Sequence, residues 1–384
     1  MAKFSIPSKV FVGRESLKEA SKLFSTFGRR ALIVTGPHVA KSPMMEELIQ
    51  VLEKETIAYN VFSEITGEPT DTMIMAGRDC YIRSHCDFII GIGGGSPLDS
   101  AKAIAVMLKC GGKISDYMGV EIEADLPPIV AIPTTAGTGS EATKFTVITD
   151  SEKDIKMLLK GDCLIPDVAI LNYEYTMDMP KSVTSATGLD ALTHAIEAYT
   201  SKKAFCLTDT YAISAIKRII NYLPAAYSNG QDCEAREQMM LAAYEAGVCI
   251  NNSSVTVVHG MSRPIGALFH VPHGISNAML LEDCLEYAID GAYDRFAALG
   301  REIGVATNNN SDEVASKRFL DKVAAVIKAC EVPTLRQYGI DEAEFVQVIE
   351  KMAHDAIASG SPGNTRKIVT EEDCIRLYKK VISK

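Results

Sequence analysis

The stretch from Cys86 to Leu108 limits the possible folds more than any other part of this sequence. An apolar run, Phe88–Ile92, leads into three consecutive glycines, Gly93–Gly95, and a helical pattern follows from Ser96 and Pro97. Glycines at such a turn let the backbone approach a phosphate, and the helix N-terminus supplies N–H groups and a partial positive charge. The stretch predicts a strand–turn–helix unit, which is either part of a nucleotide site or a tight structural turn.

Similar units fill the first half of the chain. Residues 31–35 (ALIVT) and 57–65 are typical of strands, and helices are expected over 43–56 and, capped by Thr70 or Asp71, through Ser84. Another strand, 128–133, ends in the Thr- and Gly-rich loop TTAGTGSE. In a parallel sheet such loops share one edge, and ligands bind in the crevice there. These features predict a Rossmann-like α/β dinucleotide-binding domain over residues 1–180.

After residue 180 the hydrophobic pattern becomes helical in period and stays so to residue 384. Prolines divide this half, and we expect helix ends at Pro224, Pro264 and Pro272. The predicted fold class is therefore an α/β N-terminal domain followed by an all-α C-terminal domain over residues 181–384.

Composition excludes several classes of protein. The chain of 384 residues is 47% hydrophobic and 23% charged, with a formal net charge of −10, and it contains no basic run. Nucleic acid is therefore not an expected partner. No apolar stretch is long enough to span a membrane and no signal-peptide pattern opens the chain, so we expect a cytoplasmic protein. The 10 cysteines form no CxxC pair, as in a reduced protein.

One carboxylate and three imidazoles stand out as candidate metal ligands. Asp190 and His194 are four residues apart in a helical pattern, so both side chains leave one face of a helix. His259 and His273 follow in a second segment. This donor set suits Fe²⁺ or Zn²⁺, whereas a histidine on an apolar helix can equally be a core residue.

The segments that surround these residues resemble the iron-containing (group III) alcohol dehydrogenases. GLDALTHAIEAY and VVHGM…PHG are similar to the two metal-binding signatures of that family, and GGGSP and PTTAGTGSE to its cofactor loops. The resemblance runs from about residue 5 to the C-terminus. It implies the architecture that the family shares with dehydroquinate synthase, an active site between the two halves, and a homodimer or larger assembly.

The resemblance also implies a role for each matching residue. The metal ligands would be Asp190, His194, His259 and His273. NAD(H) would contact Gly94, Gly95 and Ser96 at the pyrophosphate, Asp99, Thr134, Thr135 and Thr138 toward the nicotinamide, and Lys156 at the ribose.

Three positions depart from the family pattern. Arg263 replaces a usual histidine one helical turn after His259, and it either pairs with a structural acid or binds an anionic substrate group. The polar run 251–256 either caps helices or donates to the substrate, with Asn252, Ser254 and also Phe145 as candidate contacts. Gly36 stands where many NAD-specific members carry aspartate, so NADP(H) is also expected to bind, with His38 or Lys41 as the candidate positive partner.

The predicted function is a metal-dependent, NAD(P)-linked alcohol dehydrogenase that acts as an aldehyde reductase. The candidate substrates with an anionic tail are sulfoacetaldehyde, phosphonoacetaldehyde and succinic semialdehyde. The alternatives are a dehydrogenase of neutral short alcohols or diols (1,3-propanediol, lactaldehyde or butanol type), a glycerol dehydrogenase-like enzyme, and a nucleotide-binding regulator without activity.

Overall fold

The computed structural model describes residues 2–153 and 155–384, and the chain divides into two compact units. The α/β unit comprises Ser5–Asp178, and the helical unit comprises Met179–Lys384 together with the residues before Ser5. Within the described part of the chain, no helix combines the length and apolarity needed to cross a membrane.

The α/β unit is built on a parallel six-stranded sheet with the strand order β1-β8-β5-β4-β2-β3. The strands are short apolar runs, as expected for a sheet buried on both faces. Their side chains alternate between the faces: Leu32 and Val34 contribute to one hydrophobic core, and Ala31 and Ile33 to the other. The strands are β1 (Lys9–Val12), β2 (Arg30–Val34), β3 (Ala58–Phe62), β4 (Phe88–Gly93), β5 (Ile129–Pro133) and β8 (Val168–Leu171).

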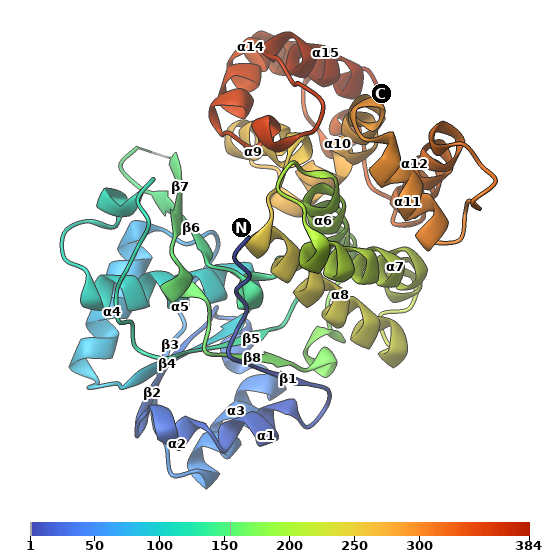
Figure 1. Ribbon diagram of the computed structural model, residues 1–384. Helices are drawn as coiled ribbons and strands as arrows, with labels where there is room; N and C mark the ends of the chain where they lie inside the picture. The colour runs from blue at the N-terminus through green and yellow to red at the C-terminus, as the bar shows by residue number, and fades with distance from the viewer. Residues whose placement is uncertain (1, 154) are drawn as a thin grey trace. The chain divides into compact units, whose positions relative to one another are not determined.

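Helices cover both faces of this sheet (Figure 1). On one face lie α1 (Ser16–Ser21), α2 (Phe24–Phe27) and α3 (Pro43–Lys54). On the other lie α4 (Asp71–Arg83), α5 (Gly95–Lys109) and the antiparallel pair β6 (Phe145–Asp150) and β7 (Ile155–Lys160). Short 3₁₀ turns complete the unit: η1 (Val39–Lys41), η2 (Ile114–Tyr117), η3 (Ser140–Ala142), η4 (Asp162–Leu164) and η5 (Tyr173–Thr176).

The strand order contains a switch point between β2 and β4. From β2 the chain proceeds outward to β3, and it then returns to place β4 and β5 on the other side of β2. Ligands of such open sheets bind outside the carboxyl ends of the strands at this point. The Thr35 hydroxyl donates to the Ile92 carbonyl at 2.8 Å, which joins the ends of β2 and β4 there.

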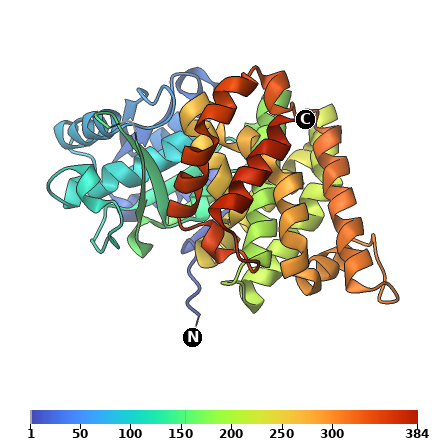
Figure 2. The same cartoon turned by 90° about the horizontal axis from the view of Figure 1, so that it is seen from above.

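The helical unit is formed by ten α-helices among the described residues. α14 and α15, red in Figures 1 and 2, lie side by side, and α11 packs against α12. The helices are α6 (Lys181–Thr200), α7 (Cys206–Ser228), α8 (Cys233–Asn252), α9 (Val257–Phe269), α10 (His273–Ala288), α11 (Tyr293–Glu302), α12 (Asp312–Ala329), α13 (Leu335–Tyr338), α14 (Glu342–Ala358) and α15 (Glu371–Ile382), with the 3₁₀ turns η6 (Ile289–Gly291) and η7 (Pro362–Asn364). The predicted fold class, a Rossmann-like α/β half followed by a helical half, is confirmed.

Two of the expected helix ends are wrong. Pro224 lies inside α7 and Pro264 inside α9. A proline removes one backbone hydrogen bond and crowds the preceding turn. In α9 the proline itself is buried, and Met261 before it and Ile265 after it are fully enclosed. We infer that this packing outweighs the single lost hydrogen bond and carries the helix through. Pro272 does mark a boundary, because α10 begins at the next residue.

Candidate metal centre and dinucleotide-binding loops

One face of α6 carries the first part of the candidate metal centre. Asp190 and His194 are buried, and Nε2 of His194 lies 3.8 Å from Oδ1 of Asp190. Glu197 lies one turn further along the same face and is 1% exposed. Three polar side chains on one buried helix face need partners from other elements.

Helices α9 and α10 supply those partners. Nε2 of His259 lies 3.7 Å and Nε2 of His273 lies 3.9 Å from the same Oδ1 of Asp190. Ligand atoms of Asp190, His259 and His273 all lie within 4.8 Å of one another. The ring of His194 stacks on that of His259 with centroids 4.6 Å apart. All four predicted ligand residues are therefore gathered around one carboxylate oxygen.

The electrostatics of this group fit a divalent cation. Burial lowers the pKa of His259 well below its usual value, and the neighbouring imidazoles lower it further, which leaves a neutral ring with a lone pair. Burial alone would raise the pKa of Asp190, but the three imidazoles and the Asn277 amide outweigh it and hold that pKa below its usual value. An ionised carboxylate beside the neutral ring of His259 matches the carboxylate and imidazole donors that Fe²⁺ and Zn²⁺ bind.

Glu197 orients His259 and was not singled out from the sequence. Its Oε2 lies 2.5 Å from Nδ1 of His259, and its Oε1 accepts from Thr256 Oγ1 at 2.6 Å and from the Val258 N–H at 2.7 Å. A carboxylate behind a ligating imidazole fixes the tautomer in which the other nitrogen is free to bind metal. The signal in the sequence is its spacing, seven residues after Asp190 on one helix face.

Asn277 is the second residue that the sequence did not reveal. Its amide nitrogen donates to Oδ1 of Asp190 at 2.7 Å and lies 3.2 Å from Nε2 of both His259 and His273. Its position four residues after His273 in α10 places both side chains on one face. Asn277 is completely buried, so it helps to hold the ligand set together.

Arg263 lies one turn after His259 in α9, as the spacing predicted. Its guanidinium donates to Oγ of Ser361 at 3.1 Å and, among the described residues, forms no salt bridge. Burial lowers the pKa of Arg263, and the carboxylate of Glu197 partly offsets this. Among the described residues, Glu197 is therefore the acid that acts on this arginine, and it does so without forming a salt bridge.

The polar run before His259 has partners within the helical unit. The Asn252 amide donates to the Val248 carbonyl at 2.9 Å, and Ser254 Oγ accepts from the Asn364 amide at 2.7 Å. Ser253 Oγ lies 3.0 Å from the Ala198 carbonyl. These contacts fit the capping and packing interpretation of the run, which joins the end of α8 to α9.

The glycine turn and the threonine loop lie against each other in the α/β unit. The Thr134 N–H donates to the Gly93 carbonyl at 2.8 Å. A Cβ on Gly95 would lie 2.9 Å from Cγ2 of Thr138, and one on Gly94 would lie 3.4 Å from Cγ2 of Thr135. No side chain caps the start of α5, so its first N–H groups are available to a ligand. The structure thus brings together, at the switch point, most of the candidate cofactor residues.

Three other candidate cofactor positions have local structural roles. Both carboxylate oxygens of Asp99 accept hydrogen bonds, from Ser140 Oγ at 2.6 Å and from the Val147 N–H at 2.9 Å. Lys156 pairs with Glu68 at 2.7 Å. A Cβ on Gly36 would lie 2.9 Å from the Ile65 carbonyl, so close packing already favours glycine there. His38 and Lys41 are exposed beyond β2.

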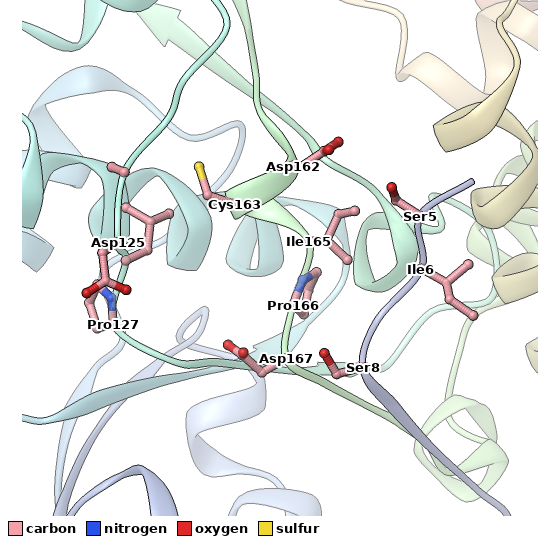
Figure 3. A pocket seen from close by; sticks show the side chains of 12 residues that line it. Ser5, Ile6, Ser8, Asp125, Pro127, Asp162, Cys163, Ile165, Pro166 and Asp167 are labelled. Carbon is pink, nitrogen blue, oxygen red and sulfur yellow. The ribbon is translucent and has the colours of Figure 1, made fainter. Parts of the chain in front are cut away.

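A cavity of about 350 Å³ in the α/β unit lies away from these loops (Figure 3). It is lined by residues that precede strands, including Ser8 before β1 and Asp167 before β8. Asp167 accepts from the Ile129 N–H at 2.8 Å, and the Cys163 thiol donates to the Ile122 carbonyl at 3.2 Å. It therefore lies at the amino ends of the strands, opposite the edge where such sheets bind ligands.

The gathered imidazoles and the switch-point loops together indicate a metal- and dinucleotide-dependent class of enzyme, and the comparisons with known proteins identify the family. Residues 7–173 match the iron-containing alcohol dehydrogenases, and residues 184–382 match the C-terminal domain of the Fe-containing alcohol dehydrogenase family. The chain belongs to this family and is an oxidoreductase, as predicted.

Individual relatives differ in the substrate that their names give. The NAD-dependent methanol dehydrogenase of Bacillus methanolicus is 35% identical over 385 residues, and the match covers 100% of this chain and 100% of that protein. A crystal structure of 1,3-propanediol oxidoreductase is 30% identical, with a TM-score of 0.96 over 99% of this chain and 100% of that one. Sulfoacetaldehyde reductase from Bifidobacterium kashiwanohense, solved in complex with NAD⁺, is 26% identical, with a TM-score of 0.89 over 100% of this chain and 99% of that one.

Proposed function

We propose that this protein is a metal-dependent, NAD(P)-linked alcohol dehydrogenase that works as a reductase of short aldehydes with an anionic tail. The observation that carries the reaction class is the set of three imidazoles around one oxygen of Asp190. We propose that Asp190, His194, His259 and His273 hold one divalent cation, Fe²⁺ or Zn²⁺. When bound, that ion supplies Lewis-acid polarisation of a substrate oxygen.

The residues behind the ligands keep the centre in a binding-competent state. Glu197 holds Nδ1 of His259, so that Nε2 is directed toward Asp190. Burial keeps the His259 ring neutral, and Asn277 fixes the Asp190 carboxylate from the opposite helix. Because these partners come from three different helices, the geometry of the centre depends on the packing of α6, α9 and α10.

We further propose that NAD(H) or NADP(H) binds at the switch point of the α/β unit. Gly94, Gly95 and Ser96 would contact the pyrophosphate at the start of α5, and Thr134, Thr135 and Thr138 would lie beside it. The NAD⁺ complex of the sulfoacetaldehyde reductase supports a nicotinamide cofactor for this chain. Asp99 would support the threonine loop rather than contact the cofactor, because both oxygens of its carboxylate already accept hydrogen bonds from Ser140 and Val147.

Cofactor preference can be tested at Gly36 by comparing two substitutions. Gly36→Ala and Gly36→Asp both place a Cβ near the Ile65 carbonyl, so both carry the same steric effect. Only aspartate adds a charge that repels a 2′-phosphate. We expect the ratio of NADPH to NADH use, measured as kcat/KM, to fall at least roughly tenfold from alanine to aspartate, which corresponds to about 1.4 kcal/mol. Equal ratios in the two variants would place Gly36 away from the ribose.

The anionic tail is inferred from the guanidinium of Arg263, which forms no salt bridge with the described residues. Arg236, which is 1% exposed, shows how a structural arginine is accommodated: it donates to Gly230 O, Thr184 Oγ1 and Met179 O. Within the described part of the chain, Arg263 has one such acceptor, Ser361 Oγ. A partly buried cation with one neutral partner is stabilised most by an anion. The oxygens of a carboxylate, sulfonate or phosphonate match the spacing of the paired N–H donors of the guanidinium.

A neutral substrate is the second candidate. The relatives of highest identity among those described above act, by name, on methanol and on 1,3-propanediol, neither of which is charged. In that case Arg263 would serve only to bind Ser361 and to tie α9 to the segment before η7.

A substrate panel distinguishes these candidates. We expect wild-type enzyme to prefer sulfoacetaldehyde, phosphonoacetaldehyde or succinic semialdehyde over propanal by roughly ten- to a hundredfold in kcat/KM, since a charge-assisted contact contributes about 1.5 to 3 kcal/mol. The preference should disappear in Arg263→His and persist in Arg318→Gln, which alters an exposed arginine of the same unit. If propanal or butanal is the better wild-type substrate, the anionic proposal is wrong while the reaction class stands.

A further inference from the structure

Ser361 is the neighbour of Arg263 whose hydroxyl group still has a hydrogen to donate. Its Oγ accepts from Nη1 of Arg263 at 3.1 Å, and the side chain is 5% exposed. No described residue offers an acceptor to the hydroxyl hydrogen of Ser361. A hydroxyl donates one hydrogen bond besides those it accepts, and an enclosed donor without an acceptor is costly. A ligand with an oxygen at this point would supply that acceptor.

The segment that carries Ser361 is anchored by contacts that do not involve the Ser361 side chain. The Asn364 amide donates to Ser254 Oγ at 2.7 Å, which connects the segment to the residues before α9. The Lys202 N–H donates to the Asn364 carbonyl at 2.9 Å, and Lys202 Nζ donates to the Gly363 carbonyl at 3.0 Å, which connects it to the end of α6. The position of the Ser361 hydroxyl is therefore set by its neighbours in the chain.

Gly260 lets this segment lie directly on α9. A Cβ on Gly260 would lie 2.6 Å from the ring of Pro362, so a larger residue there would displace the segment. Gly260 directly follows His259, and Arg263 comes three residues later, on the same face of the helix. Ser361 and Pro362 therefore lie across the face of α9 that carries Arg263, one turn from a candidate metal ligand.

The donors at this position outnumber the oxygens of a carboxylate. A guanidinium has five N–H donors, and Arg263 uses one of them, on Nη1, within the described residues. The remaining N–H groups still include a parallel pair, which matches two oxygens of an anion. The hydroxyl hydrogen of Ser361 is a third donor, next to Nη1. A carboxylate has two oxygens, whereas a sulfonate or a phosphonate has three.

Charge distinguishes the two anions that have three oxygens. Arg263 supplies one positive charge, and the carboxylate of Glu197 already acts on it. A sulfonate carries one negative charge, which the guanidinium can balance. A phosphonate, like a phosphate monoester, carries about −1.5 to −2 near pH 7, and Glu197 would repel the excess.

We propose that Ser361 is a specificity-determining residue that, together with Arg263, selects an aldehyde with a sulfonate tail over one with a carboxylate tail. Arg263 binds two oxygens of the sulfonate through its paired N–H groups, and Ser361 donates to the third oxygen. This inference rests on the proposed function, in which Arg263 binds the anionic end of the substrate.

The test compares two aldehydes that differ only in the anionic group, sulfoacetaldehyde and malonic semialdehyde. We expect wild-type enzyme to prefer sulfoacetaldehyde by roughly tenfold or more in kcat/KM, as one additional hydrogen bond to a charged group would give. In Ser361→Ala the ratio of the two kcat/KM values should fall to about one, through a higher KM for sulfoacetaldehyde, because the lost contact binds a part of the substrate that does not react. Ser361→Thr keeps the hydroxyl and should keep the preference.

A control and a binding measurement accompany these variants. Ser228→Ala alters an exposed serine of the helical unit and should retain the wild-type ratio. Should Ser361→Ala fail to fold, Ser361→Cys supplies the same comparison, because a thiol is a weak donor. Calorimetry with ethanesulfonate, which lacks the reacting carbonyl, should show the same loss of affinity in Ser361→Ala, with metal content unchanged.

The outcomes separate this inference from the proposed function. Equal use of the two aldehydes by the wild type, or an unchanged ratio in Ser361→Ala, overturns the role of Ser361 while the anionic substrate stands. A wild type that prefers phosphonoacetaldehyde to sulfoacetaldehyde overturns the choice of a sulfonate. A wild type that prefers propanal, in which a methyl group replaces the anion, contradicts the proposed anionic substrate as well.

Discussion

Replacing His259 by alanine is expected to remove most of the divalent metal and to lower turnover by more than about 100-fold. Loss of a residue that only hydrogen-bonds to a metal ligand costs up to about 100-fold, and loss of a ligand itself should cost more. The physical reason is that His259 links two parts of the centre. Its Nε2 faces Asp190, and its Nδ1 contacts the buried carboxylate of Glu197. Elemental analysis and an NADH-consumption assay measure the two losses, and circular dichroism reports whether the helical unit remains folded.

A matched control for this variant is His354→Ala. The His354 side chain is 70% exposed, and it bonds to Glu371 on the surface of the same unit. Metal content and turnover should both be unchanged in this variant. Full activity in wild-type protein that elemental analysis shows to be free of metal would contradict the proposed centre.

Substituting Gly95 by valine is expected to weaken NADH binding by at least roughly 100-fold, equivalent to about 2.7 kcal/mol, with metal content unchanged. A Cβ at this position already lies 2.9 Å from Thr138, so the larger valine must displace the loop or fill the crevice. Gly111→Val is the control, because a Cβ on Gly111, shortly after α5 ends, meets no atom within 4 Å. Isothermal titration or NADH fluorescence measures the affinity.

A double substitution separates the two ways in which Gly95→Val can act. In Gly95→Ala with Thr138→Ser, the methyl group that the new Cβ would meet is gone. If the Cβ blocks the ligand itself, binding stays weak in this double variant. Recovery of wild-type affinity would show that Gly95 acts through the loop alone, and undiminished binding in Gly95→Val would place the pyrophosphate elsewhere.

The sequence was most informative where a short-range pattern determines the structure. The apolar run before Gly93 became β4, and Thr70 caps α4 by accepting from the Met73 N–H, because both depend on neighbouring residues. The spacing of Asp190 and His194 placed them on one helix face for the same reason. The match of the second signature segment then brought His259 and His273 into the same group, which helix periodicity alone does not provide.

The roles that sequence reasoning missed depend on contacts between distant residues. Glu197 meets His259 across 62 residues, and Asn277 meets Asp190 across 87. In the sequence both are ordinary polar residues within helical patterns, where a solvated position is the usual expectation. Gly36 shows the same limitation, because the Ile65 carbonyl that restricts it belongs to a segment after the next strand.

The unequal burial of the four candidate ligands bears on how the protein acquires its ion. The side chains of Asp190, His194 and His259 are at most 7% exposed, whereas that of His273 is 41% exposed. An ion held by three enclosed donors and one accessible donor can be exchanged by way of the accessible one, without unfolding of the helices. Affinities of nitrogen and oxygen sites are higher for Zn²⁺ than for Fe²⁺. In a centre that exchanges in this way, the metal found after purification would reflect the supply in the growth medium and buffers as much as the preference of the site.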